Sequence, residues 1–312
     1  MRRSDRRLHL TSRHDTKWAF CDHLQMSNQE SAMKMNQAFR RHDDPFRDFC
    51  QWDYEPVVVP EKTTLLQSAV LLKSLPDSLA GRRLLSIFTR IQACWGEFNT
   101  VWGIKSTDGI LSWELYFYDY GRDDRRLGIS DLAKCLPELV APGLAAGDRW
   151  PWFMFSVEFD STALKTGEIG SVDLYFEHEG GTISAGVSEV WDGKLRQRKN
   201  DYRFYRSALD RAELLKDLCD LPNLPEPLAP GRYDEEIFVI SRKAISSAVY
   251  FSRVDVRRTL QFAHENGFSP ALTEFLKADA GALAPYRFDL GIDFSVQSGK
   301  SVVRRSAIYG IF

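Results

Sequence analysis

The stretch "SVDLYFEH", residues 171–178, contains a pattern that occurs twice more in the chain. The related stretches are "SWELYFYD" at 112–119 and "SSAVYFSR" at 246–253, and each has a Tyr followed by a Phe. In a β-strand, successive side chains point to opposite faces of the sheet. Each repeat therefore predicts a strand with one apolar face and one face of Tyr, acidic and small residues.

The division between the two faces is the same in each repeat. Within 171–178, Val172, Leu174 and Phe176 share one face, whereas Asp173 and Tyr175 share the other. The apolar face is expected to pack against helices, and the other face to meet water or line a cavity. The residues predicted on the second face of the three repeats are Glu114, Tyr116, Tyr118, Asp173, Tyr175, Glu177, Tyr250 and Ser252.

Alternating segments occur in pairs, which predicts five β-hairpins. Asp-Gly at 108–109 and at 192–193 stands between alternating runs, and this dipeptide is typical of hairpin turns. The predicted hairpins span 99–120, 152–178, 181–205, 235–254 and 286–312. Apolar residues at helical spacing predict helices at 61–76, 77–95, 129–140, 208–221, 255–267 and 269–281, with Asp77, Asp255 and Ser269 as N-caps.

The chain is therefore predicted to be an α+β protein with about ten antiparallel strands in five hairpins and interleaved helices. An open sheet of this size would have two edges and a large exposed face rich in Tyr. Closing the sheet removes the edges and turns that face toward a lumen. We expect a closed barrel, and the alternative is an open antiparallel sheet with helices on one face.

Composition limits the class of protein. The 312 residues are 44% hydrophobic, which is enough for a full-sized core. The net charge of -2 makes nucleic acid an unfavourable partner. Residues 1–47 hold ten Lys or Arg against six Asp or Glu and few large apolar residues, which predicts a flexible basic arm. Residues 48–312 are predicted to form a single α+β domain.

Two further features bear on the compartment. No run approaches 18 apolar residues, so neither a membrane span nor a membrane partner is expected. The five cysteines are odd in number and widely spaced, which favours free thiols in a reducing compartment and predicts a cytoplasmic protein.

Five hairpins with interleaved helices, and strands that read "VDLYF", resemble the soluble aromatic prenyltransferases. In that family, αββα repeats build a ten-stranded antiparallel barrel with helices outside. The resemblance covers about residues 60–312. It implies an interior that binds a small aromatic acceptor and a prenyl diphosphate. It implies no cofactor and leaves open whether a magnesium ion is bound.

The resemblance also implies roles for particular side chains. A carboxylate would assist the acceptor, which makes Glu114 and Asp173 the candidate catalytic residues. Tyr and Arg side chains on strands would hold the substrates. The candidate ligand-binding residues are Tyr116, Tyr118, Tyr175, Arg203, Tyr205, Arg242, Tyr250 and Arg304.

The residues leave open whether the protein is an enzyme. The alternative is a non-catalytic binding or interaction protein that presents the same Tyr-rich face to a protein partner. No pair of histidines has the i, i+4 spacing of a helical metal site, so no metal ligand is predicted. "SGKS" at 298–301 is interpreted as a hairpin turn, because Phe294 stands where a phosphate-binding loop needs Gly.

Overall fold

The computed structural model describes the greater part of the chain. All of the described residues belong to one compact unit, residues 41–312. The described ranges are 65–96, 100–118, 126–150, 152, 154–175, 186–191, 195–243 and 246–311. The predicted basic arm at 1–47 lies outside them and stays a prediction.

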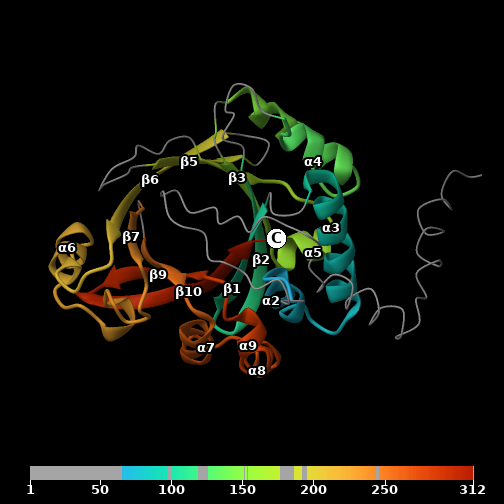
Figure 1. Ribbon diagram of the computed structural model, residues 1–312. Helices are drawn as coiled ribbons and strands as arrows, with labels where there is room; N and C mark the ends of the chain where they lie inside the picture. Colours follow the sequence, from blue (N-terminus) through green and yellow to red (C-terminus); the bar gives the residue numbers. More distant parts are fainter. Residues whose placement is uncertain are drawn as a thin grey trace, which may run out of the picture. The chain divides into compact units, whose positions relative to one another are not determined.

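Antiparallel strands dominate the described part of the chain (Figure 1). They are β1 (Thr100–Thr107), β2 (Ile110–Tyr118), β3 (Met154–Phe159), β4 (Val172–Tyr175), β5 (Gly186–Trp191), β6 (Leu195–Arg206), β7 (Ile237–Arg242), β8 (Ser247–Val254), β9 (Phe288–Gln297) and β10 (Lys300–Ile311). The order of paired strands is β1-β10-β9-β8-β7-β6-β5-β4-β3-β2, and β1 also pairs with β2, so the order returns to its first strand.

Eight strands, β1–β4 and β7–β10, hold almost all of the strand side chains that the structure describes. Taken without β5 and β6, they form an open antiparallel half-barrel in the order β4-β3-β2-β1-β10-β9-β8-β7. Backbone pairing through β5 and β6 joins β4 to β7. The predicted α+β class, with antiparallel hairpins and helices between them, is confirmed.

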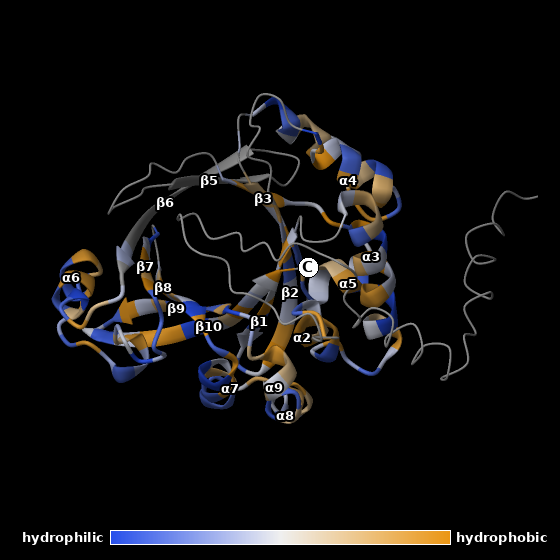
Figure 2. Ribbon diagram, viewed as in Figure 1, coloured by the Kyte–Doolittle hydropathy of each residue, from blue (hydrophilic) through white to orange (hydrophobic). Residues whose placement is uncertain are grey.

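Helices lie outside the curve of strands (Figure 1). The α-helices are α2 (Ser68–Lys73), α3 (Leu79–Trp95), α4 (Ile129–Cys135), α5 (Ser161–Thr166), α6 (Arg211–Leu218), α7 (Val256–Glu265), α8 (Pro270–Ala278) and α9 (Ala280–Leu283), and the 3-10 helices are η3 (Pro142–Arg149) and η4 (Glu226–Leu228). Figure 2 shows hydrophilic and hydrophobic residues together on α3 and α8, as expected for helices with one buried face.

The predicted N-caps are correct in two cases of three. Asp255 accepts a hydrogen bond from the backbone N–H of Arg258 at 2.8 Å, and Ser269 caps α8. The prediction for Asp77 is wrong, because α3 begins later and Ser78, in an extended conformation, accepts from the Gly81 N–H. The short helix α5 was not predicted; Asp160 caps its first turn, and Gly167 ends it with a φ of 69°.

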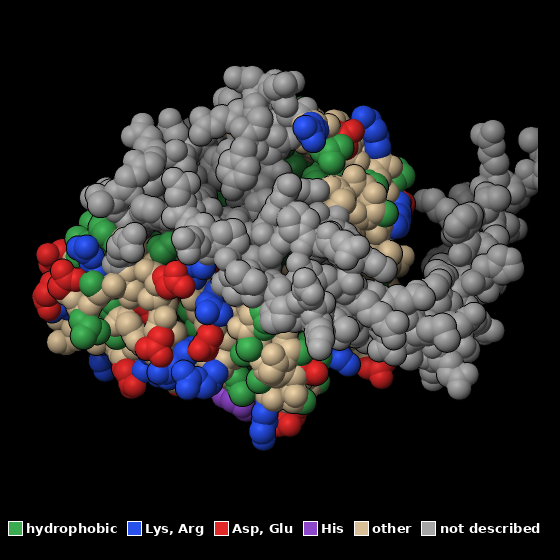
Figure 3. Space-filling model, in the orientation of Figure 1, with side chains coloured by type: hydrophobic (Ala, Val, Ile, Leu, Met, Phe, Trp, Pro, Cys, Tyr) green, Lys and Arg blue, Asp and Glu red, His purple; other side chains and the backbone are tan. Residues whose placement is uncertain are grey.

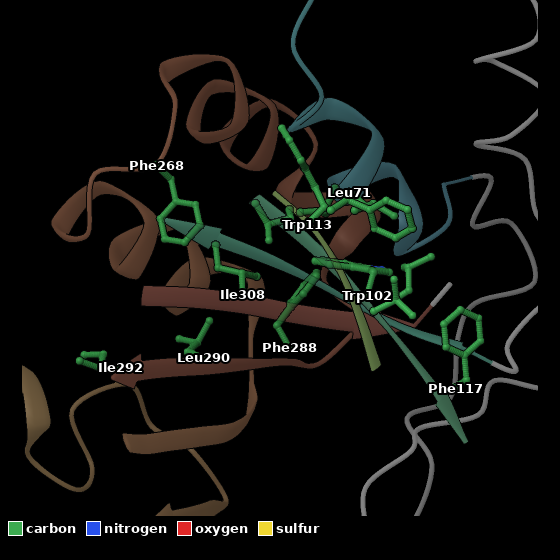
Figure 4. Packing of buried hydrophobic residues seen from close by; sticks show 14 of the residues in the cluster. Leu71, Trp102, Trp113, Phe117, Phe268, Phe288, Leu290, Ile292 and Ile308 are labelled. Atoms are coloured by element: carbon green, nitrogen blue, oxygen red, sulfur yellow. The ribbon is translucent and has the colours of Figure 1, made fainter. Parts of the chain in front are cut away.

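The hydrophobic core lies between the helices and the outward face of the strands. Phe88 of α3 packs edge-on against Phe159 of β3 with ring centroids 5.3 Å apart. Trp95 lies 4.7 Å from the Phe117 ring. Figure 4 shows Leu71 of α2 and the fully buried Trp102 of β1 within the same buried cluster. The apolar face of each repeat therefore packs against helices, as predicted.

Two tight turns position the strand ends. Asp108 and Gly109 between β1 and β2 have φ of 51° and 79°. Ser298 and Gly299 between β9 and β10 have φ of 50° and 74°. Two successive positive φ values are typical of the type I′ hairpin turn. The interpretation of "SGKS" as a hairpin turn is therefore correct.

The last strand is fixed on both sides. β10 pairs with β1 and with β9. Ile308 is fully buried, and Ile311 is 6% exposed. The Trp102 indole N–H donates to the Ile311 carbonyl at 2.8 Å, and the Gln67 amide oxygen accepts from the Ile311 N–H at 2.9 Å. The part of β10 that ends at Ile311 is thus packed into the core.

The surface of the described part is mixed in charge. Figure 3 shows Lys and Arg side chains interspersed with Asp and Glu over the described part of the face that it draws. Among the residues that the structure describes, no helix has both the length and the apolar character needed to cross a bilayer.

Deleting residues 307–312 is expected to abolish cooperative unfolding. The deletion removes the pairing of β10 with β1 and the burial of Ile308 and Ile311, each worth about 1.5–3 kcal/mol. Urea denaturation followed by Trp fluorescence measures the effect. Val303→Ser on the same strand, at a position 44% exposed, should leave the midpoint unchanged. A truncated chain that unfolds as cooperatively as the full one would contradict a fixed terminus.

Candidate functional site

The face of the strands opposite the helices, here called the interior face, is polar. In β2, Leu115 and Phe117 join the hydrophobic core, whereas Glu114 and Tyr116 alternate with them. Alternation therefore sends the carboxylate and the phenol away from the helices.

Four tyrosines lie next to one another on the interior face and form what we call the tyrosine arc. The Tyr116 ring centroid lies 6.5 Å from that of Tyr175 and 5.8 Å from that of Tyr309. Tyr309 in turn lies 6.2 Å from Tyr250. The prediction that Tyr116, Tyr175 and Tyr250 share one face is confirmed. The sequence analysis did not single out Tyr309, which joins the arc from β10.

Two glycines make room for these rings. A Cβ atom at Gly103 would lie 2.8 Å from carbons of the Tyr309 ring. One at Gly291 would lie 3.1 Å from Tyr250 and 3.2 Å from Tyr309. Because both approaches are closer than ordinary van der Waals contact, the absence of a side chain on β1 and β9 allows the arc to form.

A buried carboxylate lies beside the arc. Glu114 is 3% exposed, and its Oε1 accepts from the Ser156 hydroxyl at 2.6 Å. Its Oε2 accepts from the Tyr116 hydroxyl at 2.5 Å and forms an ion pair with Lys105. A buried charge is tolerated when it is paired and hydrogen-bonded in this way. Three adjacent strands, β1, β2 and β3, therefore fix both carboxylate oxygens.

Lys105 lies between two carboxylates. Its Nζ is 3.3 Å from Glu158 Oε2 as well as paired with Glu114. Glu158 also accepts from the Ser112 hydroxyl at 2.8 Å and lies 3.3 Å from Arg305. Burial opposes the charge on Lys105, but Glu114 and Glu158 outweigh it and raise the pKa of the ammonium group. Lys105 is therefore charged at neutral pH.

The charged groups continue along the interior face to β9. Arg305 is paired in register with Asp293, and Asp293 Oδ1 lies 3.0 Å from Lys243 Nζ. Positive and negative groups thus alternate in the order Lys105, Glu158, Arg305, Asp293, Lys243, which we call the charge ladder. In β1 and β2, Lys105 pairs with Ser112 near the turn, whereas Tyr116 pairs with Val101 farther away. The interior face therefore has a charged end at the hairpin turns and an aromatic region beyond it.

Burial keeps the interior phenols protonated. It raises the pKa of Tyr116 well above the usual value, and the negative charge of Glu114 raises it further. Burial likewise raises the pKa of Tyr309; the positive charge of Lys105 lowers it by a smaller amount, and the negative charge of Glu114 counteracts part of that lowering. At neutral pH both tyrosines are hydrogen-bond donors rather than phenolates.

A second carboxylate adjoins the arc. Asp289 is paired in register with Tyr309 and accepts from the Arg253 backbone N–H at 2.9 Å. Arg253 stands at an irregularity in β8 and has a φ of 64°, which turns its N–H toward Asp289. Burial raises the pKa of Asp289. Asp289 was not among the predicted site residues.

Five of the predicted site residues lie on the interior face. Glu114 and Tyr116 are central to it, and Tyr175 and Tyr250 extend the arc. Asp173 is paired in register with Ser156, which places it on the same face. The side chains of Tyr118 and Arg203 lie outside the described part of the chain.

Three predicted ligand-binding residues lie elsewhere. Tyr205 is paired in register with Phe238 and is buried on the core side beneath the Arg211 guanidinium, 5.1 Å from its ring centroid. Arg242, at the end of β7, is exposed and lies 3.5 Å from Asp220. Arg304 is exposed and donates to the Ser295 hydroxyl at 2.9 Å. Arg304 does not lie on the interior face because the register of β10 shifts between Val303 and Arg305, which places Arg305 on that face instead.

No metal centre is visible in the part of the chain that the structure describes. Groups of three or more His, Cys, Asp or Glu that could hold a metal ion do not occur among the described residues. Three aspartates that are close together in the sequence, Asp119, Asp123 and Asp124, lie outside that part. His178 lies outside it too.

Comparison with known proteins gives no family. The sequence matches no protein-family model and no curated protein. Its function is therefore argued from the interior face alone.

Replacing Lys105 by Met is expected to destabilise the protein by about 3–5 kcal/mol, because the change leaves Glu114 buried without its counter-charge. The free energy of unfolding from urea titration measures the effect. Lys165→Met, at an exposed position of α5, is the matched control and should change little. Combining Lys105→Met with Glu114→Gln should restore part of the loss. A single Lys105→Met variant as stable as the parent would contradict the buried pair.

Alkaline pH is expected to destabilise the fold. The folded-state pKa values of Tyr116, Tyr309 and Lys105 lie above their unfolded values of about 10 to 10.4. Their contribution is therefore complete below about pH 10 and is lost as the pH rises through the folded values. Tyrosinate absorbance should show a late fraction that ionises together with unfolding, and Tyr309→Phe should reduce it. Complete ionisation near the ordinary pKa in folded protein would contradict the buried arc.

Proposed function

We propose that the paired strands act as a closed barrel whose interior is a ligand chamber, and that the protein transfers a prenyl group from a prenyl diphosphate to an aromatic acceptor. The observation that carries the proposal is the position of Glu114. This buried carboxylate, hydrogen-bonded at both oxygens, lies between a region of aromatic rings and a region of cationic side chains on one face. Prenyl transfer needs these three elements together.

The tyrosine arc suits the prenyl chain. Cleavage of the allylic C–O bond leaves positive charge on the chain, and aromatic faces attract a cation through their quadrupole. The arc offers four rings with neighbouring centroids 5.8–6.5 Å apart. Raised pKa values keep Tyr116 and Tyr309 neutral, so neither ring presents a phenolate nucleophile that would trap the cation.

The charged end suits the diphosphate. Lys243 has three N–H donors and Arg305 has five, and their contacts within the described residues use only some of them. Ser241 adds a fully buried hydroxyl that has no hydrogen-bond partner among the described residues, on the interior face where it pairs in register with Ala248. Unused donors beside a bound diphosphate would stabilise the charge that develops on the leaving oxygen.

Glu114 is assigned the role of general base. Ser156 and Tyr116 fix its two oxygens, and Lys105 keeps a positive charge beside it. In the proposed reaction the C–O bond of the diphosphate breaks, and pyrophosphate leaves. The allylic carbon bonds to the acceptor, and the acceptor proton passes to Glu114.

A non-catalytic binding protein is the second candidate. One observation favours it: each cation of the charge ladder already faces a carboxylate, which is typical of a prearranged, charge-balanced cavity. Such a protein would bind an aromatic ligand against the arc without bond cleavage. The two candidates differ in whether pyrophosphate is released.

The test is a steady-state assay of pyrophosphate release with a panel of prenyl diphosphates and aromatic acceptors. Glu114→Gln is expected to lower kcat by about 10²–10⁴-fold and to leave donor binding within a few-fold, since the base acts in the chemical step. Glu168→Gln, which changes an exposed carboxylate, is the matched control and should be fully active.

Two outcomes would contradict the proposed enzymatic function. Binding of aromatic ligands without pyrophosphate release from any donor would favour the binding protein. Release of pyrophosphate by Glu114→Gln at the parental rate would remove Glu114 from the reaction.

A further inference from the structure

Two cysteines that are 41 positions apart in the sequence meet on the outer face. Cys94 lies in the last turn of α3 and is exposed, and Cys135 is the last residue of α4 and is partly buried. The two thiols are near neighbours, because Cys135 Sγ contacts the carbonyl oxygen of Arg90, one helical turn before Cys94. The spacing of cysteines in the sequence gives no sign of this pair, since nothing in it indicates how α3 and α4 pack.

Contacts of the backbone explain why the thiols meet. The Cys135 Sγ donates to the Arg90 carbonyl oxygen at 3.4 Å, one helical turn before Cys94. In return, the Arg90 guanidinium donates to the Cys135 carbonyl oxygen and pairs with Glu138. The end of α4 is thus held against the last two turns of α3, between Arg90 and Cys94.

We propose that Cys94 and Cys135 are a thiol–disulfide exchange site that takes low-molecular-weight disulfides such as oxidised glutathione. The exposed Cys94 thiolate attacks one sulfur of the disulfide, and one glutathione leaves as a thiolate. The Cys135 thiol gives its proton to that departing thiolate and attacks Cys94 Sγ, and the second glutathione leaves as a thiolate. Two protein thiols are oxidised, and one glutathione disulfide is reduced to two glutathione molecules.

The order of attack follows from the surroundings of the two sulfurs. Cys94 is accessible, whereas burial, together with the neighbouring Cys94 thiol, raises the pKa of Cys135 to about 12. A buried thiol that holds its proton is a poor first nucleophile but can resolve a mixed disulfide on its neighbour. The product ties α3 to α4, and α3 packs Trp95 on Phe117 and Phe155 of the sheet.

The test treats the full chain with oxidised glutathione, blocks the remaining thiols with N-ethylmaleimide, and maps disulfide-linked peptides by mass spectrometry. The parent should yield a peptide pair joined through Cys94 and Cys135, and dithiothreitol should restore both thiols. Cys135→Ser should accumulate at least tenfold more mixed disulfide on Cys94 than the parent. Cys219→Ser, at a buried position, is the matched control and should behave as the parent does.

Three results would overturn the proposal. They are a stable mixed disulfide on Cys94 in the parent, a cross-link that joins other cysteines instead, and full maleimide labelling of both thiols after oxidation. Circular dichroism of the reduced variants separates these results from a folding defect. None of them depends on the activity of the interior face.

Discussion

The ion pair between Lys105 and Glu114 is the interaction on which the interior depends. Both side chains are buried, on neighbouring strands, in the face that the helices do not cover. An unpaired charge at either position would lower the free energy of unfolding by several kcal/mol, which is a large fraction of the stability of an ordinary domain. Apolar residues at these two positions would fill the space without the energetic cost of burying charges. The pair is therefore better explained by what the interior does than by stability.

The surroundings of the pair share its organisation. Glu114 links the tyrosine arc, through Tyr116, to the charge ladder, through Lys105 and Glu158. Glycines at 103 and 291 give the Tyr309 ring its position, and the shift of register in β10 gives Arg305 its interior place. A single face thus passes from charged to aromatic along the strands. That polarity matches a ligand with an anionic end and an apolar chain, as the proposed donor has.

Much of this fold could be predicted from the sequence, because hairpins leave local signals. Alternation of apolar residues and the Asp-Gly turn located β1 and β2, and the Tyr-Phe repeats gave the orientation of three arc tyrosines. The part of the site that depends on irregular backbone was beyond prediction. Strict alternation cannot show a bulge, so Arg304 was chosen where Arg305 is the interior residue. Lys105 was missed because its importance arises from pairing across β1 and β2.

The most direct measurement is a crystal structure of the protein grown with a non-hydrolysable prenyl thiodiphosphate. We predict that the prenyl chain lies beside the Tyr116 and Tyr309 rings, that the diphosphate lies toward Arg305 and Lys243, and that the space for the acceptor adjoins Glu114. An interior filled by protein side chains, with the ligand absent or bound on the outer face, would contradict the ligand chamber and the function built on it.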